Sequence, residues 1–190
     1  TVNELIGLAE VMRGKVVRVR TRGDVASLAG TDREMLIDTC GTGGGTKRVF
    51  NVSTTAAFVV ASCGVPVAKH GNRAMSGVCG SADVLEALGV NLDLSPERCA
   101  ECIDEIGICF LFAQRHHPAM RHVGVARKSL GYRTGFNQLG PLVNPANAKR
   151  QLVGVYDPKL MFPMAEALML MGSERALLAH GEDGLDEISP

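Results

Sequence analysis

Short apolar runs alternate with segments of helical periodicity from residue 35 onward, and this alternation restricts the fold more than any other feature. We expect strands at residues 35–37, 65–68, 108–112, 152–156 and 176–179. We expect helices at residues 1–12, 54–62, 81–88, 96–106, 118–128 and 158–171. Strands and helices that alternate over short connections favour a parallel sheet. The predicted fold class is therefore α/β, with a mostly parallel central sheet flanked by helices.

Several of these helices have recognisable end signals. Thr1 and Glu4 fit a capping box, and Ser81 is the expected N-cap of the helix at residues 81–88. Ser95 stands before a proline, which suits the first turn of the next helix. Glycines near residues 14, 89 and 107 are expected to end the helices that precede them.

A glycine-rich run, residues 41–45, follows the first expected strand directly and is called the glycine loop below. Glycine permits the positive φ angles that turn successive backbone N–H groups toward one anion. The run is neither of the two commonest nucleotide motifs, because a threonine precedes Lys47. Asn51, Ser53 and Thr54 then open an apolar helix, whose N-terminus favours an anion. We interpret the run as a phosphate-binding loop, with a flexible turn as the alternative.

A cationic cluster, residues 69–73 (KHGNR), follows the second expected strand. Lys69 and Arg73 suit a pyrophosphate, and a solvated surface cluster is the alternative. Right-handed crossovers place the loops after parallel strands along one edge of the sheet. The glycine loop, residues 69–73, the segment after Phe112 and residues 181–187 are therefore expected to converge.

Three further groups of polar residues lie outside these loops. Adjacent carboxylates at residues 186 and 187 suit Mg²⁺ opposite a phosphate, whereas a solvated acidic turn is the default. The histidine pair before Pro118 favours a structural brace over catalysis. One cation from Arg127, Lys128 and Arg133 is expected to reach the cleft.

Bulk composition argues against several classes of protein. The 190 residues contain 20 Lys+Arg and 20 Asp+Glu, a formal net charge of zero, so no basic field suggests nucleic acid or anionic membrane. No apolar run approaches the roughly 18 residues of a membrane span. The six cysteines are expected to be reduced thiols, and the pair at residues 99 and 102 lacks a second pair at zinc-site spacing. We expect a cytoplasmic protein without nucleic-acid or membrane partners, and a chain truncated at both ends.

Taken together, the motifs resemble those of the anthranilate phosphoribosyltransferases, and the likeness spans essentially the whole chain. The matching strings are GTGG, N-x-S-T, KHGNR, GSAD, LFA-x-x-HHPAM, R-x-x-L-G-x-R-T-x-F-N with LGPL-x-NP, and GLDE, at residues 41–44, 51–54, 69–73, 80–83, 111–120, 127–145 and 184–187. The resemblance implies transfer of a phosphoribosyl group from phosphoribosyl pyrophosphate to the amino group of anthranilate, in tryptophan biosynthesis. It also implies a small helical domain at residues 1–29 and 116–135, an α/β domain at 30–115 and 136–190, and a homodimer through the helical domain.

The same resemblance implies which residues bind the substrates and Mg²⁺. Phosphoribosyl pyrophosphate would be held by Gly41, Gly44, Gly45, Asn51, Ser53, Thr54, Lys69, His70, Gly71, Asn72, Arg73, Ser76, Gly77 and Ser81. Anthranilate would be held by Gly41, Asn72 and Arg127, and Mg²⁺ by Ser53, Asp186 and Glu187. No residue is implied as an acid, base or nucleophile, because positioning and electrostatics suffice for this displacement.

The chain departs from the family pattern at two places. Gly45 stands where the family usually has aspartate, and the following residues 47–49 are cationic or larger. After residue 73, a serine-rich stretch is replaced by Ala74, Met75 and Gly77 around a single serine. Two alternatives therefore stay open: a pyrimidine nucleoside phosphorylase-like enzyme, and a catalytically impaired fragment or binding protein of the same fold.

Overall fold

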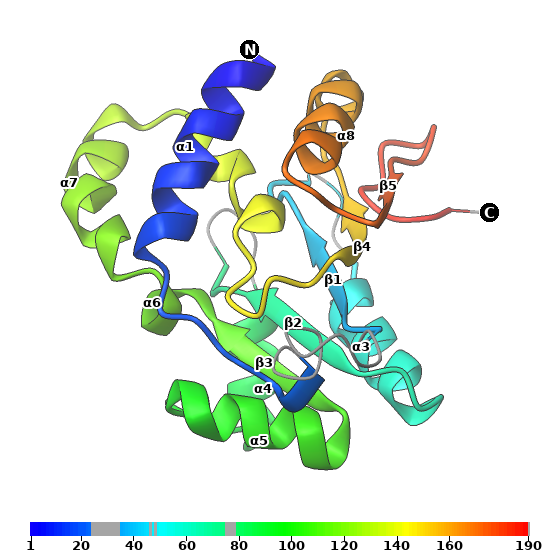
Figure 1. The fold of residues 1–190 in the computed structure, drawn as a ribbon. Helices are drawn as coiled ribbons and strands as arrows, with labels where there is room; N and C mark the ends of the chain where they lie inside the picture. The colour runs from blue at the N-terminus through cyan, green and yellow to red at the C-terminus, as the bar shows by residue number, and fades with distance from the viewer. Residues whose placement is uncertain (24–34, 46, 48, 75–78, 190) are drawn as a thin grey trace.

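The structure, a computed structural model, describes residues 1–23, 35–45, 47, 49–74 and 79–189. A five-stranded sheet with the order β3-β2-β1-β4-β5 runs through its centre, and all of its strand pairs are parallel (Figure 1). The strands are β1 (Ile37–Gly41), β2 (Val67–Gly71), β3 (Ile108–Phe112), β4 (Arg150–Gly154) and β5 (Arg175–Ala179). The predicted parallel α/β fold is confirmed.

Helices flank this sheet on both faces and cover its ends. The α-helices are α1 (Val2–Lys15), α3 (Val52–Ser62), α4 (Ser81–Ala87), α5 (Pro96–Ile106), α6 (Ala113–His116), α7 (Arg121–Leu130) and α8 (Met161–Leu170). The short 3-10 helices are η1 (Pro118–Met120), η2 (Gly135–Gln138), η3 (Gly140–Leu142) and η4 (Pro158–Leu160). The expected helices at 118–128 and 158–171 thus each begin with a 3-10 turn at proline.

The predicted helix ends are partly confirmed. The capping box of α1 is present, Ser95 accepts a hydrogen bond from the N–H of Arg98, and Gly107 ends α5 in the left-handed region. The prediction that Ser81 caps α4 is wrong: Gly80 is the N-cap, because the Asp83 carboxylate accepts the Gly80 N–H at 2.8 Å. α1 ends at Lys15, one residue beyond the glycine expected near its end.

The predicted ends of three strands are wrong for one shared reason. β1 begins at Ile37 and β2 at Val67, and both continue through polar residues to a terminal glycine. β4 begins with Arg150 and Gln151, before the apolar run that marks it in the sequence. Polar side chains lie buried in these strands because residues distant in sequence satisfy them, and an apolar run alone cannot reveal this. β3, apolar throughout, has the predicted bounds.

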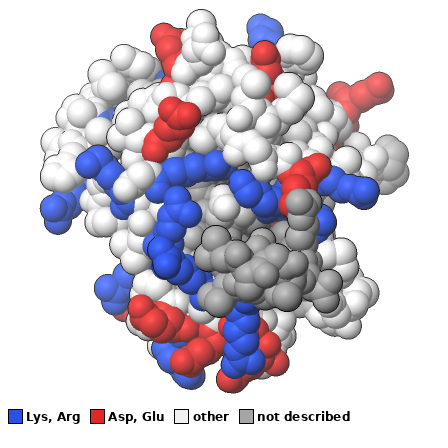
Figure 2. All heavy atoms as spheres, in the orientation of Figure 1, with Lys and Arg blue, Asp and Glu red and all other residues white. Residues whose placement is uncertain are grey.

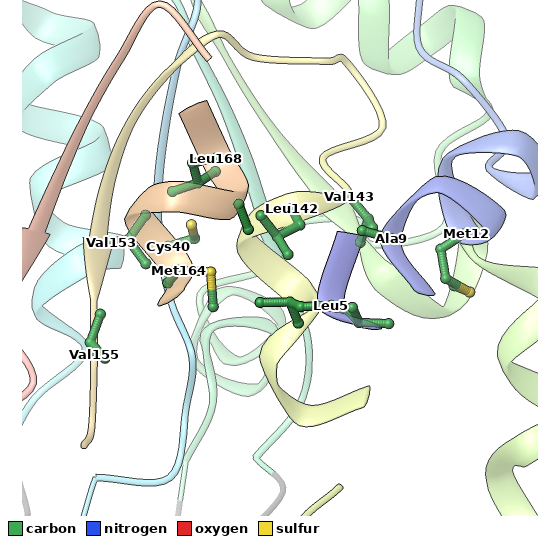
Figure 3. Packing of buried hydrophobic residues seen from close by; sticks show 12 residues of the cluster. Leu5, Ala9, Met12, Cys40, Leu142, Val143, Val153, Val155, Met164 and Leu168 are labelled. Atoms are coloured by element: carbon green, nitrogen blue, oxygen red, sulfur yellow. The ribbon is translucent and has the colours of Figure 1, made fainter. Parts of the chain in front are cut away.

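The largest core cluster joins α1 and α8 to one face of the sheet (Figure 3). Leu5 and Ala9 of α1 and Met164 of α8 meet Val153 of β4 and Leu142 of η3 in this cluster. A second cluster packs α5 against β2 and β3 on the same face, and α3 covers the opposite face, where Thr39 donates to the carbonyl of Ser53 at 2.8 Å. The sheet is therefore enclosed, as a parallel sheet requires.

Lys and Arg side chains gather across the middle of one face, with Asp and Glu side chains around them (Figure 2). Within the described part of the chain, no helix combines the length and apolar character needed to cross a membrane. The division into a helical and an α/β domain at residues 29, 115 and 135 stays a prediction.

Candidate functional site

The loops that follow the strands converge at the carboxyl edge of the sheet, as predicted. The register places Gly41 at the end of β1 beside Gly154 at the end of β4. The N–H of Thr42 donates to the carbonyl of Gly154 at 2.9 Å, and Lys47 forms an ion pair with Asp183 at 3.5 Å. The glycine loop and residues 181–187 therefore face each other across the ends of β1 and β4.

The glycine loop needs glycine for both conformation and space. Gly43 and Gly44 have φ angles of 66° and 90°, which side chains rarely adopt. A Cβ on Gly41 would lie 3.3 Å from the carbonyl oxygen of Gly154, and one on Gly45 would lie 2.5 Å from Oδ1 of Asp186. The loop thus brings backbone close to β4 and to the acidic pair.

The N-terminus of α3 opens onto the same edge. Asn51 precedes the helix, and its side chain donates to the carbonyl of Cys79 at 3.2 Å rather than capping α3. The Thr54 hydroxyl is buried and has no hydrogen-bond partner among the described residues. An unpaired buried hydroxyl costs free energy, so this helix end is one where a bound anion would add hydrogen bonds.

Lys69 is buried beneath the loops of the site. The sequence predicts it instead after the second strand, as an exposed cation. It lies within β2 with only 3% of its surface exposed. Its Nζ donates to the carbonyl of Thr39 and, at 3.2 Å, to Oγ of Ser53. Burial lowers the pKa of Lys69, whereas the nearby Asp38 opposes that shift. Lys69 therefore joins β1, β2 and the start of α3.

His70 points to the opposite face of β2 because side chains alternate along a strand. Its Nδ1 lies 3.1 Å from the carbonyl oxygen of Gly140, and its Nε2 lies 3.1 Å from Nε2 of His117. Burial lowers the pKa of His70 to about 3 and that of His117 to about 4. Both rings are thus neutral, and the carbonyl requires the proton of His70 on Nδ1. His117 then donates from Nε2, and its buried Nδ1 has no partner among the described residues.

Asp38 and Asn144 complete this buried network. The Asp38 carboxylate accepts the backbone N–H of His70 at 3.0 Å and the side-chain amide of Asn144 at 2.8 Å. The same amide of Asn144 also donates to the carbonyl of Ala68 at 2.9 Å. Burial raises the pKa of Asp38, and the hydrogen bond from Asn144 and the charge of Lys69 oppose the rise. The network holds β1 and β2 in register beneath the loops.

Arg73 ties the loop after β2 to α4. Its guanidinium lies 2.8 Å from Glu86 and 3.1 Å from Asp83, and these carboxylates raise its pKa. Asp83 also accepts the N–H of Ala74 at 2.9 Å and that of Gly80 at 2.8 Å. The carboxylate of Asp83 therefore pins both ends of the segment between residues 74 and 80. Asn72 lies beside this segment, where its carbonyl accepts the hydroxyl of Ser81 at 3.3 Å.

Asp186 and Glu187 reach the glycine loop and the start of α3. Burial, followed by the charge of Asp186, raises the pKa of Glu187, whereas Lys69 and the backbone of Ser53 oppose the rise. No cluster of three His, Cys, Asp or Glu side chains suited to a metal occurs among the described residues. Two neighbouring carboxylates still suit Mg²⁺, which takes few protein ligands and completes its shell with water and phosphate.

Arg133, which follows α7, contacts the glycine loop. Its Nη2 donates to the carbonyl of Gly44 at 2.6 Å, and its guanidinium lies 3.9 Å from the centre of the Tyr156 ring. Arg127 lies on α7 with its guanidinium 5.8 Å from the centre of the Phe136 ring. Partial burial lowers the pKa of Arg127. The expectation that one cation of this stretch reaches the cleft is thus met by Arg133.

Some of the remaining predicted residues have contacts in the structure, and others lie outside the described residues. Gly71 approaches Ser81 and Phe110 so closely that a Cβ would collide with both. Ser76 and Gly77 lie outside the described residues, as does Arg48. The histidine pair has the structural role that the sequence favours, since His116 lies 2.9 Å from the carbonyl oxygen of Val17. Sequence reasoning assigned no role to the supporting side chains Asp38, Asp83, Asn144 and Tyr156.

The chain is similar to proteins of one family along its length. A family model described as "Glycosyl transferase family, a/b domain" matches residues 33–190. The anthranilate phosphoribosyltransferase of Persephonella marina is 56% identical over 189 residues, covering 100% of this chain and 53% of that protein. The chain therefore spans about half the length of the curated relatives it matches.

Solved structures with the same fold add two comparisons. The anthranilate phosphoribosyltransferase of Thermus thermophilus has 48% identity and a TM-score of 0.85, over 98% of this chain and 53% of that one. The Saccharomyces cerevisiae enzyme in complex with PRPP and Mg has 30% identity and a TM-score of 0.86, over 100% of this chain and 51% of that one.

Proposed function

This chain belongs to the glycosyl transferase family, whose a/b domain it carries, and from that premise we propose that it transfers a phosphoribosyl group from phosphoribosyl pyrophosphate to the amino group of anthranilate. The proposal rests on one observation. The glycine loop, the N-terminus of α3 and the pair Asp186 and Glu187 meet at one edge of the sheet. Such an edge offers backbone N–H groups and carboxylates to a magnesium diphosphate.

The donor is proposed to bind along this edge. The glycine loop, the start of α3 with Asn51, Ser53 and Thr54, and the loop after β2 would surround its phosphates. Lys69 acts through Ser53, which it contacts at 3.2 Å, and Arg73 acts through the loop that it ties to α4. These two cations thus shape the donor site rather than present open charges to it.

Ser53, Asp186 and Glu187 are the residues proposed to hold Mg²⁺. Their fit is supported by the closeness of the two carboxylates: burial raises the pKa of Glu187 most, the charge of Asp186 raises it further, and a cation would relieve that repulsion. When bound, Mg²⁺ neutralises charge that develops on a departing pyrophosphate. The start of α3 and the glycine loop hold the diphosphate itself.

The acceptor is proposed to lie toward α7. Arg127 would pair with the carboxylate of anthranilate, while Asn72 and Gly41 would line the opposite side. An aromatic amine is neutral at pH 7, so this chain needs no strong base to make the nucleophile. The role proposed for its residues is to orient the amine toward the ribose and to prevent anthranilate from binding in other orientations. We also propose a cytoplasmic homodimer formed through residues 1–29 and 116–135.

Arg127→Ala tests the acceptor assignment. We expect it to weaken anthranilate binding at least tenfold, since a charged hydrogen bond contributes roughly 1.5–3 kcal/mol, with little change for the donor. The measurement is calorimetric titration of the chain with phosphoribosyl pyrophosphate and Mg²⁺, then with anthranilate. Arg121→Ala, an exposed arginine on the same helix, is the matched control. Equal losses for donor and acceptor in the Arg127 variant contradict the assignment.

The same titration tests the proposed function itself. Donor binding followed by transfer to anthranilate supports it. Donor binding with no transfer supports instead a binding protein of the same fold, the alternative that Gly45 favours. Turnover of a pyrimidine nucleoside with phosphate, and none of anthranilate, would replace it with a phosphorylase.

A further inference from the structure

We propose that Arg133 is a positioning residue that clamps the glycine loop, holding Gly44 so that the backbone N–H groups of the loop stay directed toward a diphosphate. The clamp is a property of the unliganded loop, whereas its purpose rests on the proposed function. Arg133 comes from the segment after α7, and the loop that it contacts lies 89 residues earlier in the chain.

The first contact is the hydrogen bond from Arg133 to the carbonyl of Gly44. Its length of 2.6 Å is short for a nitrogen donor, as charge-assisted bonds are. A backbone carbonyl that faced a phosphate would repel it. When the guanidinium binds this carbonyl, the carbonyl oxygen points to Arg133 and not to the anion. The hydrogen bond also fixes the peptide plane between Gly44 and Gly45. The orientation of the next N–H is fixed with it, because the peptide unit is planar.

The second contact is between Arg133 and the ring of Tyr156. The guanidinium of Arg133 lies 3.9 Å from the centre of the Tyr156 ring, within the range of a cation–π interaction. The backbone N–H of Tyr156 donates to Oγ1 of Thr42 at 3.2 Å. Tyr156 thus binds the base of the loop through its backbone and the clamp through its ring. Tyr156 therefore holds the glycine loop at two points: directly at Thr42, and at Gly44 through Arg133.

The third observation is the absence of a side chain at position 44. A Cβ there would collide with the guanidinium of Arg133, and the φ of 90° at Gly44 disfavours any side chain. The backbone at this position therefore favours glycine, and a side chain there would displace the guanidinium from its present place. Gly43, which shares a positive φ, meets nothing within 4 Å of an added Cβ. The close approach is specific to Gly44.

A direct phosphate-binding role fits these contacts less well. The planar face of Arg133 is stacked on Tyr156, and one edge already serves the Gly44 carbonyl. Lys47, which lies just after the glycine loop, is paired with Asp183. Arg133 also lies in the same stretch as Arg127, the residue proposed to bind anthranilate. Its contact with Gly44 therefore links that stretch to the glycine loop, which is proposed to bind the diphosphate.

Two variants and two readouts test the clamp. In Arg133→Ala, we expect the amides of residues 41–45 to exchange with solvent about tenfold faster by NMR, in the absence of ligand. We expect affinity for inorganic pyrophosphate with Mg²⁺ to fall by about the same factor, because the loop must then be ordered on binding. Arg133→Lys keeps a donor but loses the stacked plane, and should recover part of both effects.

Controls separate the clamp from general loss of structure. Amides of β3 should exchange as in the wild type in every variant. Tyr156→Leu removes the ring and leaves Arg133 in place, and should reproduce part of the change in residues 41–45. Arg98→Ala removes an exposed arginine paired with Glu101 on α5, and should change neither readout.

Each outcome decides one question. Unchanged exchange in residues 41–45 of Arg133→Ala overturns the clamp, whether or not pyrophosphate affinity falls. Lost affinity with unchanged exchange would make Arg133 a direct phosphate ligand instead. Faster exchange together with a wild-type chain that does not bind pyrophosphate supports the clamp and contradicts the proposed function.

Discussion

The buried base of the site and its exposed rim are built in different ways. In the base, Asp38, Lys69, His70, His117 and Asn144 are buried, and the contacts among them link β1, β2 and the segments behind them. On the rim, the glycine loop is exposed or partly exposed at most of its positions and is held by a few contacts to residues distant in sequence.

This difference separates stability from binding. A buried polar group that loses its partner costs the full desolvation penalty, whereas an exposed ion pair contributes about 0–1 kcal/mol. Changes in the buried base should therefore mainly lower the free energy of unfolding. The rim should decide how tightly a diphosphate binds, since its weak contacts can rearrange when a ligand enters.

The largest expected effect is that of Asp38→Ala. The change leaves the His70 N–H and one Asn144 contact unpaired, and it removes the charge that most opposes the lowered pKa of the buried Lys69. We expect the free energy of unfolding to fall by about 3–5 kcal/mol. Urea unfolding measures it, with Asp93→Ala as control, because Asp93 pairs with Arg115 on the exposed surface. A loss no larger than that of the control would mean that the base does not hold the sheet.

An intermediate effect is expected from acid. Burial keeps His70 and His117 neutral in the folded chain, with pKa values of about 3 and about 4. The unfolded imidazole has a pKa of about 6.5, so the unfolded state takes up protons first as the pH falls. Stability is thus fully present above about pH 6.5 and is lost toward pH 4, by about 2 kcal/mol per histidine between pH 7 and pH 5.

His117→Gln isolates one half of this effect. Glutamine keeps a donor for Nε2 of His70 but does not titrate, so the variant should lose less stability than the wild type between pH 7 and pH 5. His122→Gln, an exposed histidine on α7, should leave the pH dependence unchanged. Urea unfolding at both pH values measures the difference, and identical slopes for all three chains would rule out a buried neutral pair.

The smallest effect is expected on the rim, from Gly45→Asp. A side chain at residue 45 would meet the flexible carboxylate of Asp186, which can rotate away. We expect a loss of less than about 1 kcal/mol without Mg²⁺, from repulsion between like charges. Adding Mg²⁺ should stabilise the variant more than the wild type in thermal melts, because the site then offers a third carboxylate.

Gly45→Asn supplies the same shape without the charge. It should respond to Mg²⁺ as the wild type does. If the aspartate and asparagine variants gain equally, then residue 45 does not face the proposed metal site.

Local signals in the sequence are sufficient where neighbouring residues decide the structure. Ser95, Pro96 and Gly107 bracket α5, and the apolar run of β3 gives its bounds directly. The convergence of the loops follows from the handedness of parallel crossovers alone. The proposed substrate site is thus largely a product of local pattern and topology.

The base cannot be found in this way. Asp38 interrupts an apolar run, and its partner Asn144 lies 106 residues away. The sequence predicts His70 in a loop, but it is buried in β2, where the carbonyl of Gly140, 70 residues later, accepts a hydrogen bond from its Nδ1. A polar residue in a strand is tolerated only when such a partner exists, and a single sequence does not contain that information.

Asp83 has a consequence for how this family can vary. Its carboxylate holds Ala74 and Gly80, so the span between them starts and ends at fixed points. Added bulk or lost hydroxyls within that span need not shift β2 or α4. The departures expected from the resemblance, at residues 74, 75 and 77, fall at or within these two points. One acidic side chain thus fixes where this span of the chain begins and where it ends.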